Sequence, residues 1–192
     1  MRTLEDFEEA LGSTETTVAV GSWVSGGLVA YSICRRSDRN PYSDVAYLED
    51  IDPANSQLWI GLGTVVHPDF EGRLLMARLL NHRREILAKL NVEHEVGLAA
   101  VGNLSSIASI VRAGGILVGL ARDENALNYV AYRGNLLNST QFHGDPAPVN
   151  WTDIDGLQKL FRSGRVATDL ERKGERQRNL ILRSFELLDP MH

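Results

Sequence analysis

The chain has 192 residues, of which 43% are hydrophobic and 23% are charged, and this composition is sufficient for one globular domain with its own core. Its formal net charge of −5 gives no general attraction to nucleic acid or to an anionic membrane, and no apolar run approaches the roughly 18 residues that a membrane-spanning helix needs. Cys34 is the single cysteine, so an intramolecular disulfide is excluded and a cytoplasmic, intracellular setting is the simplest expectation, although an exported or virion-associated protein without disulfides would have the same composition.

The first third of the chain predicts mainly strands. The expected elements are a short helix at Thr3–Leu11 and strands at Thr16–Trp23, Leu28–Cys34, Val45–Ile51 and Gln57–Val66. The turn Ser25-Gly26-Gly27 makes a hairpin of the first two strands. Gly61 and Gly63 lie inside the last strand, and glycine in a strand is typical of a bulge or of a close approach by another backbone or a ligand.

The middle of the chain alternates helices with strands. The pattern predicts helices at Gly72–Leu90 and Asn103–Ala113, and strands at Glu95–Val101, Ile116–Gly119 and Leu127–Arg133. The last two strands are expected to form a final hairpin. Strands that precede and alternate with helices on a largely continuous sheet predict an α/β or α+β fold.

After Gly134 the composition changes. We expect a first domain at residues 1–134, a linker at residues 135–150 that contains two prolines, and a helical C-terminal extension at residues 151–192. Its helices are expected to run from Thr152 to about Ser163 and over Val166–Leu188. An apolar stripe from Ile181 to Leu188 predicts docking on the domain or on another subunit.

The segment from Val66 to Leu80 has the most informative pattern. It leads from an apolar strand through a Pro-Asp turn and a glycine into a helix with leucines on one face. This resembles the first signature of the GNAT superfamily of acyl-CoA-dependent N-acyltransferases, which is a strand, then V-x-P-x-(Y/F)-R-G-x-G-x-G, then a helix. The residues that match it without a gap are Val66, Pro68, Phe70 and Gly72.

A second GNAT signature follows a later strand. It has an asparagine, a small residue three positions on, and a G-(F or similar) pair eleven and twelve positions on. The residues with this spacing are Asn103, Ser106, Gly114 and Gly115. The resemblance covers roughly Thr16–Arg133, and it implies a mixed, mostly antiparallel GNAT-like sheet flanked by helices.

The resemblance also implies a site for acetyl-CoA or CoA. Orphan N–H groups and the helix dipole favour an anion at a helix start, and by resemblance the pyrophosphate is held by the backbone of Gly72, Arg73, Leu74, Leu75 and Met76. The pantetheine arm is expected to add beside Val65 and Val66, in a cleft where the central strands splay. Asn103 and Ser106 are expected to line the far side of the cleft, although a helix N-cap alone would explain Asn103.

Several positions depart from the GNAT pattern. Glu71 places a carboxylate where the family prefers Arg or Gln. Leu74 and Met76 replace glycines that permit close approach of the backbone to the pyrophosphate. Ile110 stands at the usual position of the acid tyrosine. The segment from Val66 to Leu80 therefore predicts either a binding site for the pyrophosphate of CoA or an inherited turn whose only role is to start a helix.

Catalytic residues are weakly indicated. No acidic residue lies within Leu58–Val66, where a general base often sits, which leaves Glu49 as a candidate base and Tyr129 as a candidate from the last predicted strand. The alternatives are a solvated carboxylate and a half-buried sheet tyrosine. The five histidines and Cys34 show no metal-ligand spacing, so no metal site is predicted.

Two functions remain open from the sequence. The first is a GNAT-type N-acetyltransferase that transfers an acyl group from acetyl-CoA, or a related acyl-CoA, to an amine. The second is a catalytically inactive GNAT-like domain, a structural component of a larger complex or virion. It would contact a protein partner or a second copy of the chain through its C-terminal helices. Neither a membrane nor nucleic acid is an expected partner, because the chain is acidic and lacks a stacking platform of aromatics.

Overall fold

A computed structural model describes residues 16–54, 57–122, 127–134, 140–173 and 177–187. Within these residues, nine strands form one sheet in the order β1-β2-β3-β4-β6-β5-β8-β9-β7. The strands are β1 Thr17–Val24, β2 Gly27–Arg36, β3 Leu58–Val66, β4 His94–Ala100, β5 Ile116–Arg122, β6 Leu127–Gly134, β7 Thr140–Asn150, β8 Arg165–Lys173 and β9 Gln177–Leu187. The helices are α2 Leu75–Lys89, α3 Leu104–Arg112 and α4 Ile154–Arg162, with short 3-10 helices η1 Ala46–Leu48 and η2 Pro68–Phe70.

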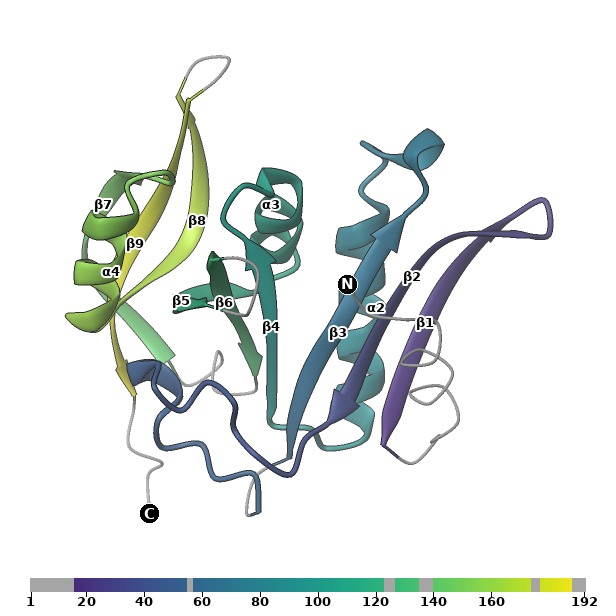
Figure 1. Ribbon diagram of the computed structural model, residues 1–192, viewed down its shortest axis with the longest axis horizontal. Coiled ribbons are helices and arrows are strands. Elements are labelled where there is room, and N and C mark those ends of the chain that lie inside the picture. The colour runs from purple at the N-terminus through teal and green to yellow at the C-terminus, as the bar shows by residue number, and fades with distance from the viewer. Residues whose placement is uncertain (1–15, 55–56, 123–126, 135–139, 174–176, 188–192) are drawn as a thin grey trace.

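The sheet is mixed and mostly antiparallel, as the sequence predicted. β3 and β4 pair in parallel, and the other strand pairs of the described residues are antiparallel. Figure 1 shows α2 behind β1–β3, while the segment that joins β2 to β3 lies in front of the sheet. The two faces around β3 are therefore covered by different parts of the chain.

Local sequence explains the first hairpin and α2. The turn of the hairpin uses positive φ at Ser25 and Gly26, which places β1 and β2 in antiparallel register. On α2, Leu79, Arg83 and Leu87 recur every four residues and are all buried, so they form the face that contacts the sheet. The chain then leaves α2 through Asn91 at φ 55, a left-handed position that asparagine tolerates.

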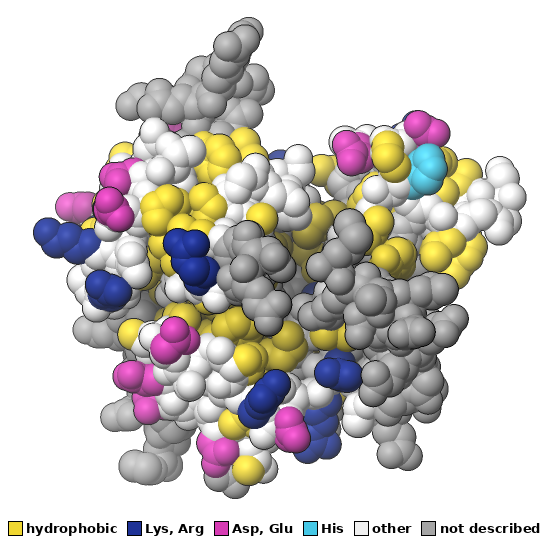
Figure 2. Space-filling model, viewed as in Figure 1, with side chains coloured by type: hydrophobic (Ala, Val, Ile, Leu, Met, Phe, Trp, Pro, Cys, Tyr) yellow, Lys and Arg dark blue, Asp and Glu magenta, His cyan; other side chains and the backbone are white. Residues whose placement is uncertain are grey.

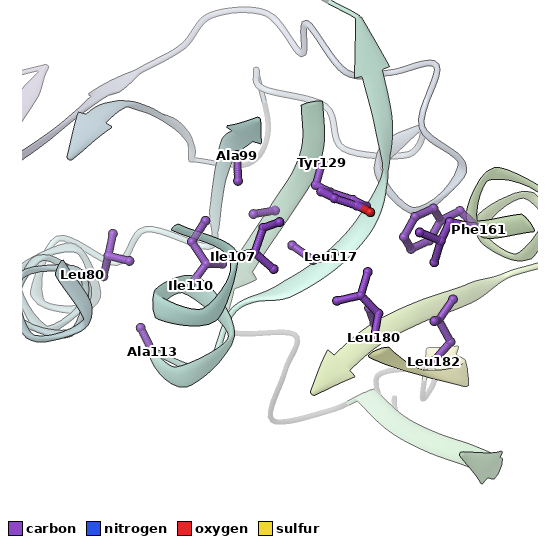
Figure 3. Close-up of a cluster of buried hydrophobic side chains, with 13 residues drawn as sticks. Leu80, Ala99, Ile107, Ile110, Ala113, Leu117, Tyr129, Phe161, Leu180 and Leu182 are labelled. Atoms are coloured by element: carbon purple, nitrogen blue, oxygen red, sulfur yellow. The ribbon is translucent and has the colours of Figure 1, made fainter. Parts of the chain in front are cut away.

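Three clusters of buried residues form the core of the described chain. One joins α3 and α4 to the sheet around Tyr129, Leu117, Leu157 and Leu180 (Figure 3). A second lies on the other face, where Leu48 of η1 packs with β3, β4, β5 and β6. The third places Leu79 and Leu87 of α2 against Val18, Cys34 and Trp59 of β1–β3. Both faces of the central strands are thus buried, although by different partners.

Two sequence predictions are wrong. The segment Val45–Ile51 is not a strand, because Val45 and Leu48 are buried with the three-residue spacing of the 3-10 helix η1. The segment Val166–Leu188 is not a helix: residues 165–173 and 177–187 are β8 and β9, and buried Leu180 and Leu182 have the two-residue spacing of a strand.

The remaining C-terminal predictions have mixed outcomes. Helix α4 is present, and Asp153 caps it by accepting a hydrogen bond from Gly156 N at 3.1 Å. Within the predicted linker, Thr140–Asn150 forms β7 and pairs with β9. Leu117 of β5 pairs with Ala167 of β8, so one sheet continues into the C-terminal part. The division at residues 134 and 150 into separate units stays a prediction, and the predicted helix Thr3–Leu11 lies outside the described residues.

The α/β (α+β) fold class is confirmed by the described elements. The helices among them are not long and apolar enough to cross a membrane.

Candidate active site

The centre of the site is the place where β3 and β4 separate. Their parallel pairing includes Leu58–Ile60 on β3 and ends at Ile60 opposite Val96. Beyond that point β3 keeps its antiparallel pairing with β2 on one edge, as far as Val66 opposite Ala30, and β4 keeps its pairing with β6. The edge of β3 from Gly61 to Val66 that faces β4 therefore has no strand partner among the described residues, and its N–H and C=O groups are available to an added strand.

A bulge shapes this edge of β3. Gly61 pairs with Cys34 and Gly63 with Ile33, so Leu62 is an extra residue between two consecutive partners. The sequence predicted a bulge at these two glycines, and the register confirms it. A Cβ added at Gly63, or at Gly97 across the gap on β4, would meet no atom within 4 Å. Open space therefore lies beside both strands.

This space is a cleft of about 230 Å³ between β3, β4, α2 and α3. Its lining residues are Gly61, Gly63, Thr64, Met76, Leu80, Arg83, Glu95, Gly97, Leu98, Ser106, Ile110 and Ala131. The lining includes five positions that the sequence singled out, and they come from three elements: Gly61 and Gly63 of β3, Met76 of α2, and Ser106 and Ile110 of α3. Most of the remaining lining is apolar or glycine, which is typical of a small-molecule site.

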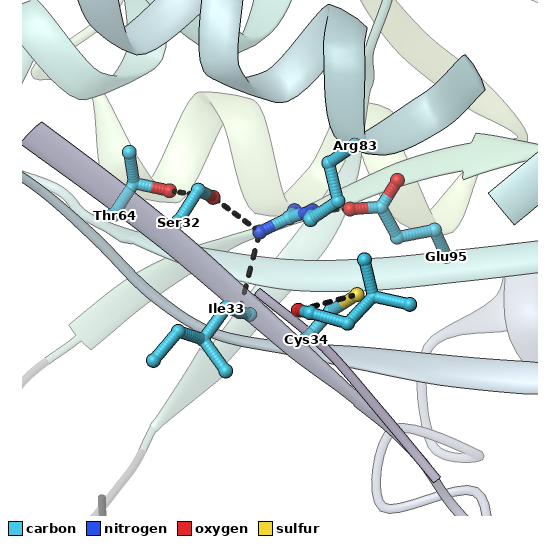
Figure 4. A network of polar contacts seen from close by, with 7 residues as sticks. Ser32, Ile33, Cys34, Thr64, Arg83 and Glu95 are labelled. Carbon is cyan, nitrogen blue, oxygen red and sulfur yellow. Dashed lines mark hydrogen bonds and ion pairs between the residues drawn. The ribbon is translucent and has the colours of Figure 1, made fainter. Parts of the chain in front are cut away.

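A buried ion pair closes one part of the cleft (Figure 4). Arg83 of α2 donates through Nη2 to Oε1 of Glu95 on β4, and the two side chains are only 5% and 8% exposed. Through Nη1 the same guanidinium donates to Ser32 Oγ at 2.5 Å and to Ile33 O at 3.2 Å. Ser32 Oγ in turn lies 2.7 Å from Thr64 Oγ1. One network thus joins α2 to β2, β3 and β4 near the point where β3 and β4 separate.

The turn before α2 has the geometry of an anion site. Gly72 has φ +73 and Leu74 has φ 61, so the chain passes through two left-handed residues before the helix begins at Leu75. The predicted helix start at Gly72 is therefore wrong by three residues. No side chain caps α2, and its first turn has no acidic residue, whereas α3 and α4 are capped by Asn103 and Asp153. The first N–H groups of α2 are the kind of donors that a bound phosphate would satisfy.

Leu74 and Met76 carry side chains at the start of α2, where the GNAT signature has glycines. Leu74 is 48% exposed in a backbone conformation that costs a non-glycine residue roughly 1–2 kcal/mol. Ser106 Oγ contacts Met76 Sδ at 3.7 Å, so these residues meet across the cleft between α2 and α3. Asn103 Oδ1 accepts from Ser106 N at 3.0 Å, which is the N-cap role that the sequence offered as its simple explanation.

The other candidate cofactor contacts lie at the edge of the site. Val65 and Val66 are the last residues of the unpaired β3 edge, and the side chain of Val65 is 47% exposed. Arg73 is exposed and its guanidinium lies 5.0 Å from the centre of the Phe70 ring. Glu71 is also exposed, where a rotation of its side chain can carry the carboxylate away from the turn.

The two candidate catalytic residues do not line the cleft. Tyr129 is fully buried, its hydroxyl donates to Trp151 O, and burial raises its pKa above the usual value of 10.0. Glu49 is exposed at the end of η1, on the segment that covers the opposite face of the sheet. The described residues contain no group of three or more His, Cys, Asp or Glu placed to hold a metal ion.

Sequence reasoning missed Arg83 and Glu95, although a signal was present. Arg83 has the four-residue spacing of the buried leucines Leu79 and Leu87, so a helical wheel places it on the apolar face. Glu95 is the first residue of a predicted strand that is otherwise apolar. A charge on a buried face requires an opposite charge nearby, and the pairing of these two residues could have been inferred from that rule.

Comparisons with known proteins agree on the fold. The sequence matches no protein-family model and no curated protein. The structure is similar to the aminoglycoside acetyltransferase AAC(6')-Ib in complex with coenzyme A and kanamycin, with a TM-score of 0.52, 16% identity, and coverage of 69% of this chain and 77% of that one. It is also similar to Arabidopsis thaliana Naa50 in complex with the bisubstrate analogue CoA-Ac-MVNAL, with a TM-score of 0.53, 14% identity, and coverage of 69% and 82%. The chain therefore has the GNAT acetyltransferase fold.

Proposed function

We propose that this GNAT-fold chain is an N-acyltransferase that moves an acyl group from acetyl-CoA, or a related acyl-CoA, to an amine. The observation that carries the proposal is the unpaired edge of β3 in an open cleft, with the uncapped start of α2 beside it. An extended amide-bearing arm and an anionic group are the two chemical features that these elements accept. Acyl-CoA has both, in its pantetheine and its pyrophosphate.

The residues present fit this donor. The edge from Gly61 to Val66 would pair with the amides of the pantetheine arm, and the open space beside Gly63 and Gly97 would hold it. The N–H groups from Gly72 to Met76 would bind the pyrophosphate. The acyl-CoA supplies a thioester whose carbonyl carbon accepts the amine.

The transfer itself is a substitution at that carbonyl. The amine nitrogen forms the new C–N bond, the C–S bond breaks, and the thiolate takes up a proton while the amine loses one. The buried network of Arg83 and Glu95 holds α2 against β2, β3 and β4, and so fixes the width of the cleft in which this geometry is reached. Glu49, the sequence candidate for the base, lies on the segment that covers the opposite face of the sheet and does not line this cleft, so it is not assigned that role.

Leu74 and Met76 set the expected strength of donor binding. A side chain on Leu74 occupies space beside the N–H groups that would face the pyrophosphate, and Met76 contacts Ser106 across the cleft. We therefore expect this chain to bind CoA in the same mode as a chain with glycines at these two positions, but with lower affinity.

The alternative function, an inactive assembly component that binds partners through C-terminal helices, has no observation in its favour among the described residues. The stripe that suggested it, from Ile181 to Leu188, lies on strand β9 as far as Leu187, and its Leu182 is buried in the core of the domain.

Binding of acetyl-CoA to the purified chain tests the proposal directly. A ligand that binds the folded state at a concentration of 100 times its Kd stabilises it by about 2.7 kcal/mol, which thermal unfolding detects and calorimetry confirms. Gly63→Val fills the open space beside β3 with a side chain suited to a strand, so it should abolish the thermal shift while the protein stays folded. Leu28→Thr, an exposed change at the tip of the first hairpin, is the matched control and should keep the shift.

A variant with smaller side chains at the start of α2 shows whether a lack of binding to the native chain is caused by steric crowding. Leu74→Gly/Met76→Ala removes both side chains that narrow the seat and should bind acetyl-CoA more tightly than the native chain. The absence of any thermal shift at millimolar acetyl-CoA, in both the native chain and this variant, would falsify the proposal.

A further inference from the structure

A second concave region lies on the other face of β3. It is a groove of about 980 Å³ at the end of β2, beneath the segment that joins β2 to β3. Its lining residues are Thr16, Arg35, Arg36, Ser37, Asp38, Arg39, Pro41, Tyr42, Pro53, Ala54, Ile60 and Leu62. Figure 2 shows Lys and Arg side chains in the lower part of this face, near the place where β2 ends in Figure 1. The groove is large enough for a small organic molecule.

Unpaired positive charge distinguishes this groove. Arg35, Arg36 and Arg39 are exposed, and none of them forms an ion pair with any described residue. Asp38 is the acidic residue of the lining, so cations outnumber anions there. The whole chain has a net charge of −5, so a concavity whose lining includes three arginines without an ion pair to a described residue is locally more positive than the rest of the chain.

The backbone that presents these arginines is held in place. Asn40 donates through Nδ2 to Leu48 O at 2.7 Å and accepts from Tyr42 N at 3.1 Å, which fixes the segment against η1. Ser37 Oγ donates to Arg39 O at 2.7 Å. Because the turn is already ordered, less conformational entropy is lost when a ligand engages the guanidiniums.

The groove and the acyl-CoA cleft share one strand as a wall. Ile60 and Leu62 line the groove, whereas Gly61 and Gly63, which alternate with them along β3, line the cleft. The bulge at Leu62 lies where β3 has just separated from β4. A molecule seated in the groove therefore lies across β3 from the cleft.

We propose that the groove binds the phosphate or carboxylate group of a small amine, and that this amine is the acyl acceptor. The second clause rests on the acyltransferase function proposed above. The planar guanidinium fork of arginine donates parallel hydrogen bonds to either anion, so the arginines of the lining favour an anionic ligand over a neutral one. The apolar walls formed by Ile60, Leu62 and Tyr42 accommodate the carbon skeleton of the amine.

Binding of three matched amines tests the groove without any need for catalysis. O-phosphoethanolamine, β-alanine and ethanolamine present a phosphate, a carboxylate and no anion, respectively. Calorimetry at low salt should show that at least one of the anionic amines binds about tenfold or more tightly than ethanolamine, and the difference should shrink as salt screens the charges. The tighter of the two anionic amines identifies the anion.

Two triple variants locate the site. Arg35→Gln/Arg36→Gln/Arg39→Gln should remove the preference for the anionic amine. Lys89→Gln/Arg112→Gln/Lys159→Gln, which removes three exposed charges from the ends of α2, α3 and α4, should keep it. Equal binding of all three amines, or an equal loss in both variants, overturns the proposal.

The acceptor role has a separate measurement. If acetyl-CoA stabilises the chain, the preferred amine should accelerate release of free thiol from acetyl-CoA, and the groove variant should lose that acceleration. If the amine binds but acetyl-CoA does not, the anion site stands and the acyltransferase function falls. If acetyl-CoA binds but no anionic amine does, the acyltransferase function stands and the groove proposal falls.

Discussion

Arginines lie on both sides of β3, and their surroundings are opposite. Arg83 on the α2 side is 4% exposed and bonds to a carboxylate, a hydroxyl and a carbonyl of its own chain. Arg35, Arg36 and Arg39, which line the groove, are exposed and make no ion pair with the described residues. A guanidinium that is buried must be paired, because leaving water costs it several kcal/mol, whereas an exposed one keeps its hydration.

The difference separates two kinds of test. Groups that the chain satisfies internally should change the free energy of unfolding when they are replaced. Groups that the chain leaves unsatisfied should change ligand binding and leave the stability nearly unchanged. Each prediction below applies this distinction to a named group.

The largest effect is expected at Arg83. Arg83→Met leaves the carboxylate of Glu95 buried without its cation, which should lower the free energy of unfolding by about 3–5 kcal/mol. Arg83→Met/Glu95→Leu removes both charges and should recover much of that loss, since apolar residues often replace a buried pair at little cost. Urea unfolding of the two variants measures the difference. A loss below about 1 kcal/mol in the single variant would show that the pair is solvated.

The stability of the chain should depend on pH through His94, which forms a buried neutral pair with Tyr132 on the face of the sheet away from α2. His94 precedes Glu95 on β4, is buried, and lies 2.8 Å through Nδ1 from the hydroxyl of Tyr132. Burial lowers the pKa of His94 below 6.5, against a smaller opposing effect of Glu93. The unfolded chain therefore binds a proton at a higher pH than the folded chain does. Stability is full above about pH 6.5 and falls as the pH decreases below it, by up to about 1.4 kcal/mol per pH unit for this group.

His94→Gln isolates this contribution, because glutamine does not titrate. The variant should show a weaker loss of stability between pH 7 and pH 5, measured by urea unfolding at each pH. An identical pH dependence in both proteins would mean that His94 has the same pKa in the folded and the unfolded chain.

The start of α3 provides a smaller test at a satisfied group. Asn103→Ala removes the acceptor for Ser106 N and should cost about 1 kcal/mol of stability. Asn103→Asp keeps an acceptor at the N-cap and should retain most of it. If Asn103→Asp is as unstable as Asn103→Ala, the side chain does more than cap the helix.

At the unsatisfied start of α2, the expected change is smaller and of opposite sign. Leu74→Gly relieves a left-handed conformation of a residue that is 48% exposed, so stability should rise by about 0.5–1 kcal/mol. Chemical denaturation without ligand measures this change. A destabilised variant would show that the Leu74 side chain contributes packing that outweighs its backbone strain.

The sequence was most informative where structure depends on neighbours along the chain. The first hairpin, the turn at Pro68 and Asp69, the bulged glycines of β3 and the cap at Asn103 all follow from local rules of turn and helix chemistry. The strand, turn and helix of the GNAT signatures could therefore be predicted from the sequence. The two left-handed residues at Gly72 and Leu74 were not, because leucine gives no signal for a positive φ.

Features that depend on distant partners were missed. The residues from Val166 to Leu188 have apolar spacings that suit a helix or a strand, and pairing with β5 and β7 decides in favour of the strands. Arg83 and Glu95 are twelve positions apart and form an ion pair only because α2 folds back onto β4. The groove beside the end of β2 gives no signal in the sequence, because it depends on the hydrogen bond by which Asn40 holds the following loop against η1.

The smallest effect is expected for the arginines of the groove. Arg35→Gln/Arg36→Gln/Arg39→Gln breaks no ion pair among the described residues, so the free energy of unfolding should change by less than about 0.5 kcal/mol per site. Relief of repulsion among three neighbouring cations favours the variant slightly at low salt, and that gain should vanish at high salt. Urea unfolding at two salt concentrations measures both. A loss of several kcal/mol would mean that these guanidiniums are satisfied within the chain, as Arg83 is, and are not available to a ligand.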